Sequence, residues 1–155
     1  MNTLFVFVSG IFPATERNGD KMTSAERLIE KGIRPSLTRV MIYDYLLSHR
    51  THPTVEEIYK ELSPKAPTLS KTTVYNTVKL FSQEGVIKML TIEEQQARFD
   101  ACTDHHGHFL CNDCKKVYDF DVDVPCDSLP QGFTAQTKEI YYTGSCKNCL
   151  TSFKK

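Results

Sequence analysis

The sequence has no excess of charge of either sign, because 19 Lys and Arg residues balance 19 Asp and Glu residues. A strongly basic composition, which would point directly to nucleic acid, is therefore missing, and net charge argues neither for nor against DNA. The two halves differ slightly: residues 22–91 hold ten basic and seven acidic residues (+3), and residues 92–155 hold seven and ten (−3). A basic half followed by an acidic half rich in Cys and His suits a nucleic-acid module joined to a cation-binding module.

The chain also lacks a long hydrophobic run. The apolar stretch near its start, residues 4–8, is too short to span a bilayer, and no positive charge precedes it. Charged and polar residues follow at positions 16–20, so a secretory signal peptide is not indicated either. We therefore expect residues 1–21 to be a disordered extension, with Met22 as an alternative start of the native protein, and we expect the protein to be cytoplasmic.

A third missing feature is the His-x-Glu motif of zinc-dependent nucleobase deaminases. The histidine cluster of this chain reads His106-Gly107-His108, with no Glu to act as general acid and base. A thioredoxin-like oxidoreductase would place one reactive C-x-x-C pair after a strand of a βαβ unit, whereas this chain has two matched pairs. We therefore expect a protein that is not an enzyme.

The two C-x-x-C pairs, Cys111 with Cys114 and Cys146 with Cys149, are the strongest signal in the sequence. Each pair can turn two thiolates toward one point, and two pairs can surround a Zn²⁺ ion tetrahedrally with four sulfurs. A zinc site closed by four sulfurs stabilises structure and does not catalyse. The alternatives are two independent redox or accidental pairs, or disulfides if the protein is secreted, but paired C-x-x-C spacing favours a metal.

The first half of the chain predicts four helices. A Ser or Thr stands at each expected start, where its hydroxyl can accept a hydrogen bond from a free backbone N–H, and Gly32 and Gly85 follow two of the expected ends. The helices are expected from Thr23 or Ser24 to about Lys31, from Pro35 and Ser36 to about Leu47, from Thr54 to Leu62, and from Ser70 to about Glu84. Helical spacing predicts as inward-facing residues Leu28, Ile29, Val40, Ile42, Tyr43, Leu46, Leu47, Val55, Ile58, Tyr59, Leu62, Val74, Thr77 or Val78, and Phe81.

Two short β-prone runs, residues 86–90 and 97–100, follow the fourth helix and predict a hairpin. Three helices, a fourth helix and a hairpin in this order indicate a winged helix-turn-helix, in which the fourth helix lies in the major groove of DNA. On the exposed face of this helix, Lys and Thr can bind phosphates, Asn can read an adenine and Tyr can pack on a thymine methyl group. The alternative is an ordinary solvated helix face. The residues concerned are Lys71, Thr72, Tyr75, Asn76 and Lys79.

The motifs together resemble the ferric uptake regulator family of metal-dependent repressors. The resemblance covers essentially residues 22–149, and its motifs occur in the family's order: 52–54 (His-Pro-Thr), 70–78 (Ser-Lys-Thr-Thr-Val-Tyr-Asn-Thr-Val), 98–100 (Arg-Phe-Asp), 106–108 (His-Gly-His) and the two cysteine pairs. It implies an α/β (α+β) fold and a homodimer that binds double-stranded DNA at a pseudo-palindromic operator. The winged-helix DNA-binding domain would be residues 22–101, and a small, strand-dominated dimerisation and metal-binding domain would be residues 102–155.

The resemblance also implies two metal sites and further DNA contacts in each protomer. One structural zinc would be bound by Cys111, Cys114, Cys146 and Cys149. A regulatory Fe²⁺ or Mn²⁺ ion between the domains would be bound by His52, Asp100, His106, His108 and Asp119. Arg34 and Arg39 match basic residues that touch DNA in the family, while Cys102 and Cys126 match no ligand position and are expected to be buried apolar fillers.

The sequence departs from the family pattern in two places. A further metal site of the family, in which His105 would take part, needs a carboxylate at Gly107 and a histidine at Lys138, so we expect that site to be absent. The segment 121–131 is shorter than the family's helix-bearing segment and contains two prolines, so we expect no full helix there.

The carboxylates at positions 100 and 119 indicate which chemical signal the protein senses. Both are Asp, as in the peroxide-sensing members, whereas the iron sensors more usually have Glu. A shorter carboxylate can leave a coordination position of Fe²⁺ open to peroxide. In that branch a ligand histidine, here His52 or His106, is then oxidised and the repressor leaves DNA. We therefore expect a peroxide-responsive repressor, with an iron-responsive repressor as the alternative and a zinc-responsive one as a weaker alternative.

Overall fold

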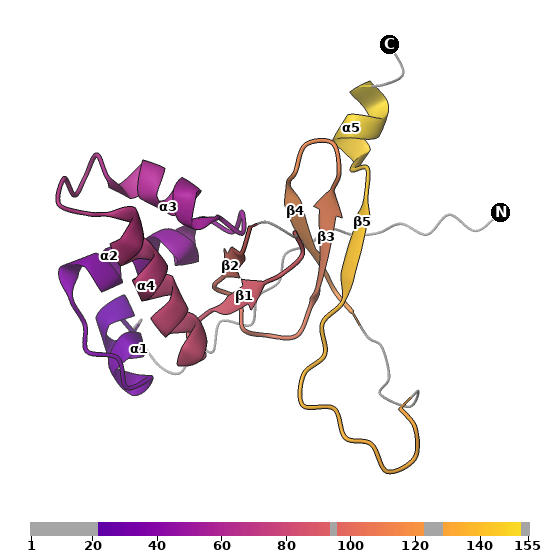
Figure 1. Ribbon diagram of the computed structural model, residues 1–155, viewed down its shortest axis with the longest axis horizontal. Helices are drawn as coiled ribbons and strands as arrows, with labels where there is room; N and C mark the ends of the chain where they lie inside the picture. Colours follow the sequence, from indigo (N-terminus) through magenta and orange to yellow (C-terminus); the bar gives the residue numbers. More distant parts are fainter. Residues whose placement is uncertain (1–21, 94–95, 123–128, 153–155) are drawn as a thin grey trace.

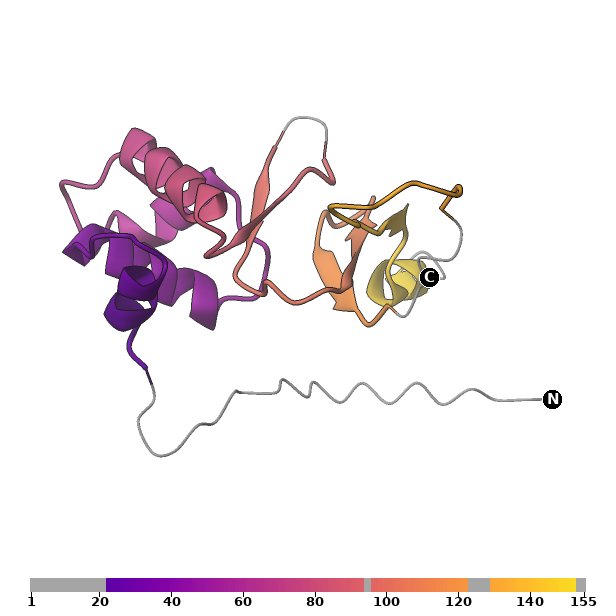
Figure 2. The same cartoon turned by 90° about the horizontal axis from the view of Figure 1, so that it is seen from below.

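The computed structural model of the protein describes residues 22–93, 96–122 and 129–152. Figures 1 and 2 both show helices α1–α4 on one side, a sheet of β3–β5 with α5 on the other, and the β1–β2 hairpin between them. Residues 1–21, for which a disordered extension was predicted, lie outside this description. Within the described ranges, no helix is both long enough and apolar enough to cross a membrane.

The four predicted helices are present: α1 (Ser24–Glu30), α2 (Leu37–Ser48), α3 (Val55–Leu62) and α4 (Lys71–Gln83). Gly32 and Gly85 follow the first and last of them with φ of +73° and +63°, a left-handed conformation that glycine adopts without steric cost. Each helix begins after a hydroxyl residue that accepts a hydrogen bond from the backbone N–H three residues on: Thr23, Ser36, Thr54 and Ser70. Local side-chain chemistry therefore sets these helix starts.

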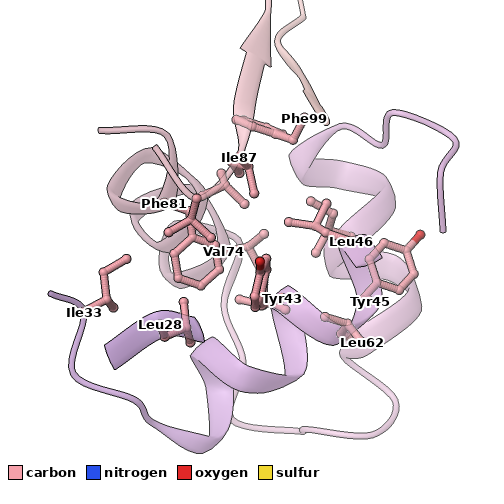
Figure 3. Packing of buried hydrophobic residues seen from close by; sticks show 14 of the residues in the cluster. Leu28, Ile33, Tyr43, Tyr45, Leu46, Leu62, Val74, Phe81, Ile87 and Phe99 are labelled. Atoms are coloured by element: carbon pink, nitrogen blue, oxygen red, sulfur yellow. The ribbon is translucent and has the colours of Figure 1, made fainter. Parts of the chain in front are cut away.

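The hydrophobic core of the described residues lies among α1–α4 and is closed by residues next to and within the hairpin. Figure 3 shows Phe81 and Val74 of α4 facing Leu28, Tyr43 and Leu46. The rings of Tyr43 and Phe81 pack edge to face with centroids 5.7 Å apart. Most of the predicted inward-facing residues are in this core or packed against it.

One predicted core residue is wrong: Ile29 is 60% exposed. Helix α1 has only seven residues, and its buried residue is Leu28. Ile29 points about 100° further round the helix than Leu28, and on this short helix at the edge of the core that direction faces solvent. In α4 Thr77 and Val78 are both buried, whereas one of the two was predicted, and Tyr45 of α2 is buried without having been predicted.

The predicted hairpin is confirmed as β1 (Lys88–Leu90) and β2 (Arg98–Asp100), paired antiparallel with Met89 opposite Phe99. Strand β2 also pairs with the loop that precedes α3. Thr54 bridges to Arg98, and the Phe99 N–H donates to the Pro53 carbonyl at 3.1 Å. The loop before α3 is therefore fastened to the hairpin.

The second sheet has the order β4-β3-β5, with β3 (Gly107–Cys111) in the middle. It pairs antiparallel with β4 (Val117–Phe120) and parallel with β5 (Tyr141–Gly144). A short helix, α5 (Lys147–Ser152), follows β5 and was not predicted. The fold is thus the expected winged helix followed by a small, strand-dominated domain. The centre of the segment for which no helix was predicted, residues 123–128, lies outside the described residues.

Candidate metal centres

The four cysteines of the two C-x-x-C pairs come together in space. Their sulfur atoms all lie within 4.8 Å of one another, and the Sγ atoms of Cys111 and Cys149, and of Cys114 and Cys146, are 3.8 Å apart. Four sulfurs at about 2.3 Å from a central Zn²⁺ would be separated by about 3.8 Å in a tetrahedron. The cluster therefore has the dimensions of a four-sulfur zinc site.

Backbone N–H groups prepare this cluster for cation binding. The amides of Cys114 and Cys146 point at the thiol of Cys111 and lower its pKa. The Cys149 amide and then the Tyr118 hydroxyl lower the pKa of Cys146 to about 6. Beside it, the hydrogen bond from the Cys149 thiol to the Cys146 sulfur, and then burial, raise the pKa of Cys149 to about 12. Full ionisation of all four cysteines therefore needs a cation among them.

A second cluster contains imidazoles and carboxylates. Ligand atoms of His52, Asp100, His106 and His108 all lie within 4.8 Å of one another. Asp119 faces the same imidazoles, with its Oδ1 at 2.8 Å from the Nε2 of His52 and at 3.6 and 3.7 Å from those of His106 and His108. The structure thus brings together all five residues that the sequence analysis assigned to a regulatory cation.

These five residues come from both sides of the molecule. His52 lies in the loop before α3, and Asp100 ends β2. On the sheet side, His106 and His108 lie two residues apart at the start of β3, so both side chains point to one face. Asp119 of β4 is the register partner of His108. The cluster therefore spans the junction between the winged helix and the sheet.

The backbone of His52 is in a conformation that L-residues seldom adopt. Its φ is +52°, in the left-handed region, and its side chain is 2% exposed. The left-handed conformation costs an L-residue about 1–2 kcal/mol. Its Nδ1 has no hydrogen-bond partner among the described residues, and its Nε2 faces the cluster, 2.8 Å from Asp119 Oδ1. The fold thus keeps an imidazole in an unfavourable position, where its lone pairs can serve a cation.

Neighbouring backbone groups orient two further ligands. The Nδ1 of His106 lies 2.9 Å from the Asp104 carbonyl, which holds a proton on Nδ1 and directs Nε2 toward the cluster. The Cys102 N–H donates to Asp100 Oδ1 at 2.7 Å and leaves Oδ2 free. Asp100 Oδ2 lies 3.1 Å from the Nε2 of His106 and 3.5 Å from that of His108, and in the described part of the chain these three buried atoms have no hydrogen-bond partner outside the cluster. Such orphaned atoms aimed at one point fit a bound cation.

Opposite charges in the cluster stabilise one another. Burial alone would raise the pKa of Asp100, but the imidazoles of His106 and His108 beside it hold that pKa well below its usual range. The same holds for Asp119, with His106 and His52 beside it. The Asp100 and Asp119 carboxylates in turn raise the pKa of His106 to about 10. Without a cation the site is therefore two carboxylates around a protonated His106, whose proton a divalent cation would replace.

The predicted DNA-contacting residues of α4 lie on its exposed face. On α4, Lys71, Thr72, Tyr75, Asn76 and Lys79 are all exposed. The ammonium of Lys71 lies 2.6 Å from Glu56 of α3. Arg34 is exposed, whereas Arg39 is half-buried and donates from Nη1 to the Arg34 carbonyl at 2.7 Å.

Three further residues differ from the predictions or were not predicted. Cys102, expected to be a buried filler, is half-buried and acts through its N–H; Cys126 lies outside the described residues. His105 is exposed and is not part of the cluster. Arg98 was predicted only as part of a motif, yet it is buried and donates to carbonyls of two distant loops. The polar residue at a buried position of β2 is the sequence signal that could have indicated it.

Comparison with known proteins agrees with this geometry. The model of the ferric uptake regulator family matches residues 30–140. The peroxide-responsive repressor PerR of Staphylococcus aureus strain Mu50 is 38% identical over 133 residues, which cover 81% of this chain and 88% of that protein. The PerR of Staphylococcus epidermidis is 37% identical over 134 residues, covering 81% and 87%. The crystal structure of the Vibrio cholerae ferric uptake regulator superposes with a TM-score of 0.66 at 25% identity, covering 79% of this chain and 98% of that one.

Proposed function

The chain belongs to the ferric uptake regulator family of metal-responsive transcriptional regulators, and we propose that within it this protein is a repressor that peroxide releases from DNA. The observation that carries the proposal is the five-residue cluster, in which both carboxylates are Asp and the ligands come from both sides of the junction. The names of the relatives, peroxide-responsive repressors at 37–38% identity, favour the same choice.

The family's members are DNA-binding dimeric regulators, and the proposal assigns α4 to the major groove of the operator. Tyr75 and Asn76 would then set base preference, while Lys71, Thr72, Lys79, Arg34 and Arg39 would contact phosphates. A two-fold dimer requires a pseudo-palindromic operator. We place the boundary between the DNA-binding and dimerisation domains near residue 101, after the hairpin, and we expect the protein to act in the cytoplasm.

The switch would follow from where the ligands lie. His52 and Asp100 belong to the winged-helix side, and the other three ligands, His106, His108 and Asp119, belong to the sheet side. A cation bound by all of them fixes the angle between the two sides, and its loss frees that angle. A structural zinc in the four-cysteine cluster, one per protomer, would keep the sheet side rigid. The mixed imidazole and carboxylate set suits Fe²⁺ or Mn²⁺, and Zn²⁺ competes by affinity.

Peroxide sensitivity would come from the same site. Fe²⁺ held by these residues would supply the electron that breaks the O–O bond of hydrogen peroxide; overall, one peroxide oxygen would be inserted into a ring C–H bond of a ligand histidine and the other would leave as water. His52 and His106 are the ligands expected to gain an oxygen atom. His52 is held from the winged-helix side, and an oxidised ring would bind the cation less well. The winged helix would then be released from its DNA-binding orientation.

Mass spectrometry tests this proposal. Protein loaded with Fe²⁺ without oxygen is treated with hydrogen peroxide, and Mn²⁺-loaded protein is the matched control. We expect one added oxygen on the peptide with His52 or His106 in the Fe²⁺ form only, together with loss of DNA binding. The Asp119→Glu variant should bind Fe²⁺ but oxidise more slowly. Unmodified His52 and His106 with intact DNA binding would reject peroxide sensing and favour the iron-responsive alternative.

A further inference from the structure

Arg98 of β2 is a buried arginine that joins the two sides of the molecule. The residue is 7% exposed. Its Nη1 donates to the His52 carbonyl at 3.2 Å, and its Nη2 donates to the Lys115 carbonyl at 3.1 Å. The Nε also donates to the Glu93 carboxylate at 3.0 Å, which holds the guanidinium in place. The switch described above gives Arg98 no role, although it touches the backbone of a candidate ligand.

On the winged-helix side, Arg98 acts on the residue with the unusual backbone. The His52 carbonyl accepts from Arg98, while the His52 imidazole faces the cation cluster from the same left-handed residue. The pairing of β2 with Pro53 and Thr54 adds two further backbone contacts to this loop. Arg98 therefore helps to set the direction in which the His52 ring points.

On the sheet side, Arg98 acts on the turn that carries the first cysteine pair. Lys115 directly follows Cys114, and its N–H donates to the Cys111 carbonyl at 2.9 Å. Its φ of +60° is again left-handed, so the direction of its carbonyl is set by this tight turn. A guanidinium is a planar fork with donors at fixed angles, so one Arg can hold two carbonyls at a set separation.

We propose that Arg98 is a positioning residue that fixes His52 against the Cys111–Cys114 turn, so that the regulatory cation meets an assembled site. The inference rests on the regulatory site of the proposed function. It adds that the cysteine cluster and the His/Asp cluster are joined through one side chain. Breaking that link leaves all five ligands in the chain but lets His52 move away from the three ligands on the sheet side, His106, His108 and Asp119.

Direct Mn²⁺ titration of the zinc-containing protein tests the proposal without reference to DNA. Loss of a residue that orients a metal ligand weakens metal affinity by about 10–100-fold, and we expect Arg98→Met to fall in this range. Zinc content should remain that of the wild type. DNA affinity at saturating Mn²⁺ should return to the wild-type value, because the ligands themselves are intact. Small-angle scattering of the Mn²⁺-free variant should show a larger radius of gyration than the wild type.

Two further variants separate positioning from general stability. Arg98→Lys keeps the charge, but one ammonium cannot hold both carbonyls in the fork geometry, so its Mn²⁺ affinity should also fall. Lys115→Gly removes an exposed side chain and keeps the carbonyl, and glycine tolerates the φ of +60°, so its Mn²⁺ affinity should not change.

The outcomes are distinguishable. Wild-type Mn²⁺ affinity in folded Arg98→Met and Arg98→Lys would overturn the inference and leave the proposed function standing. Loss of zinc, or DNA binding that does not recover at saturating Mn²⁺, would show a general structural role and would also overturn it. If Arg98→Met does not fold, the Mn²⁺ affinity of Arg98→Lys alone tests the inference. Failure of the wild type to bind Mn²⁺ would reject the proposed function and the inference together.

Discussion

Replacing His52 with Gly should remove the response to Mn²⁺ without destabilising the metal-free protein. The wild-type residue buries one ring nitrogen, Nδ1, that has no hydrogen-bond partner among the described residues, which costs about 1–3 kcal/mol. It also has a φ of +52°, which costs an L-residue about 1–2 kcal/mol and glycine nothing. The substitution removes all of these costs.

The substitution also removes favourable contacts. The ring packs edge to face on His108 with centroids 5.1 Å apart, worth about 0.5–1.5 kcal/mol. Its Nε2 lies 2.8 Å from the Asp119 carboxylate, and a bond to a charged group is worth about 1.5–3 kcal/mol. A Gly in place of another residue costs about 0.5–1 kcal/mol in backbone entropy. Gains and losses are of similar size, so we expect the metal-free unfolding free energy to change by less than about 2 kcal/mol.

Thermal unfolding of the zinc-containing protein, with chelator or with Mn²⁺, measures both effects. At a free Mn²⁺ concentration of 100 times Kd, the wild type should gain about 2.7 kcal/mol. For a chain of this size, that gain raises Tm by about 5–10 °C. His52→Gly should show no such rise at the same Mn²⁺ concentration. The control is His49→Ala, which removes an exposed histidine outside the cluster and should keep the full rise.

Two results would refute this reasoning. A Tm of metal-free His52→Gly more than about 8 °C below that of the wild type would mean that the imidazole stabilises the fold itself. An undiminished Mn²⁺ response in His52→Gly would mean that the cation binds without the winged-helix side.

Four further predictions concern the two clusters and the sheet between them. Cys111→Ser should unfold the sheet domain, because structural zinc contributes about 10–16 kcal/mol of folding free energy at pH 7. His106→Ala should keep the fold and lose Mn²⁺ binding. Circular dichroism with metal analysis distinguishes the two variants, and equal losses of stability would contradict the prediction. Mn²⁺ uptake at pH 7 should release about one proton. The carboxylates beside His106 raise its pKa from 6.5 to about 10, so the metal-free residue carries a proton that Mn²⁺ replaces. Calorimetry in two buffers of different ionisation enthalpy counts the released proton. In the metal-free protein the same ion pairs stabilise the fold fully between about pH 4 and pH 6.5; this stabilisation is lost as pH rises through about 10 and His106 loses its proton, and as pH falls below about 4 and Asp100 and Asp119 gain protons. Gly107→Ala should lower the unfolding free energy by about 1–3 kcal/mol, because a Cβ at this position would overlap the Phe120 ring. Adding Phe120→Leu should restore part of the lost free energy, and denaturant titrations measure both effects.

The helices and the hairpin could be predicted because their signals are local. Ser36 and Ser70 each stand at a helix start, and their hydroxyls bond to backbone only three residues away. The prediction that Ile29 is buried was wrong because α1 is short, and seven residues define a helix face poorly. Helix α5 was missed because the spacing of Cys146 and Cys149, which indicates a metal knuckle, is also about one helical turn.

The candidate ligands could be assigned only through the family resemblance, because no local pattern joins His52 to the sheet. The role of Arg98 could not be predicted from the sequence at all. Its carbonyl partners are 46 residues before it and 17 residues after it in the chain, and both are backbone atoms that leave no mark on residue type. The left-handed φ of His52 and Lys115 is likewise set by the fold, since neither residue is a glycine that would have indicated it.

The most direct test is the DNA affinity of one protein sample with and without the regulatory cation. A duplex selected from a random pool by Mn²⁺-loaded protein is titrated by fluorescence anisotropy at fixed salt, with the four-cysteine zinc verified in both states. If a cation bound by both sides sets the orientation of the winged helix, its removal should weaken binding by about 5–150-fold, the usual range of coupling between two sites. Equal affinity in the two states would contradict the account.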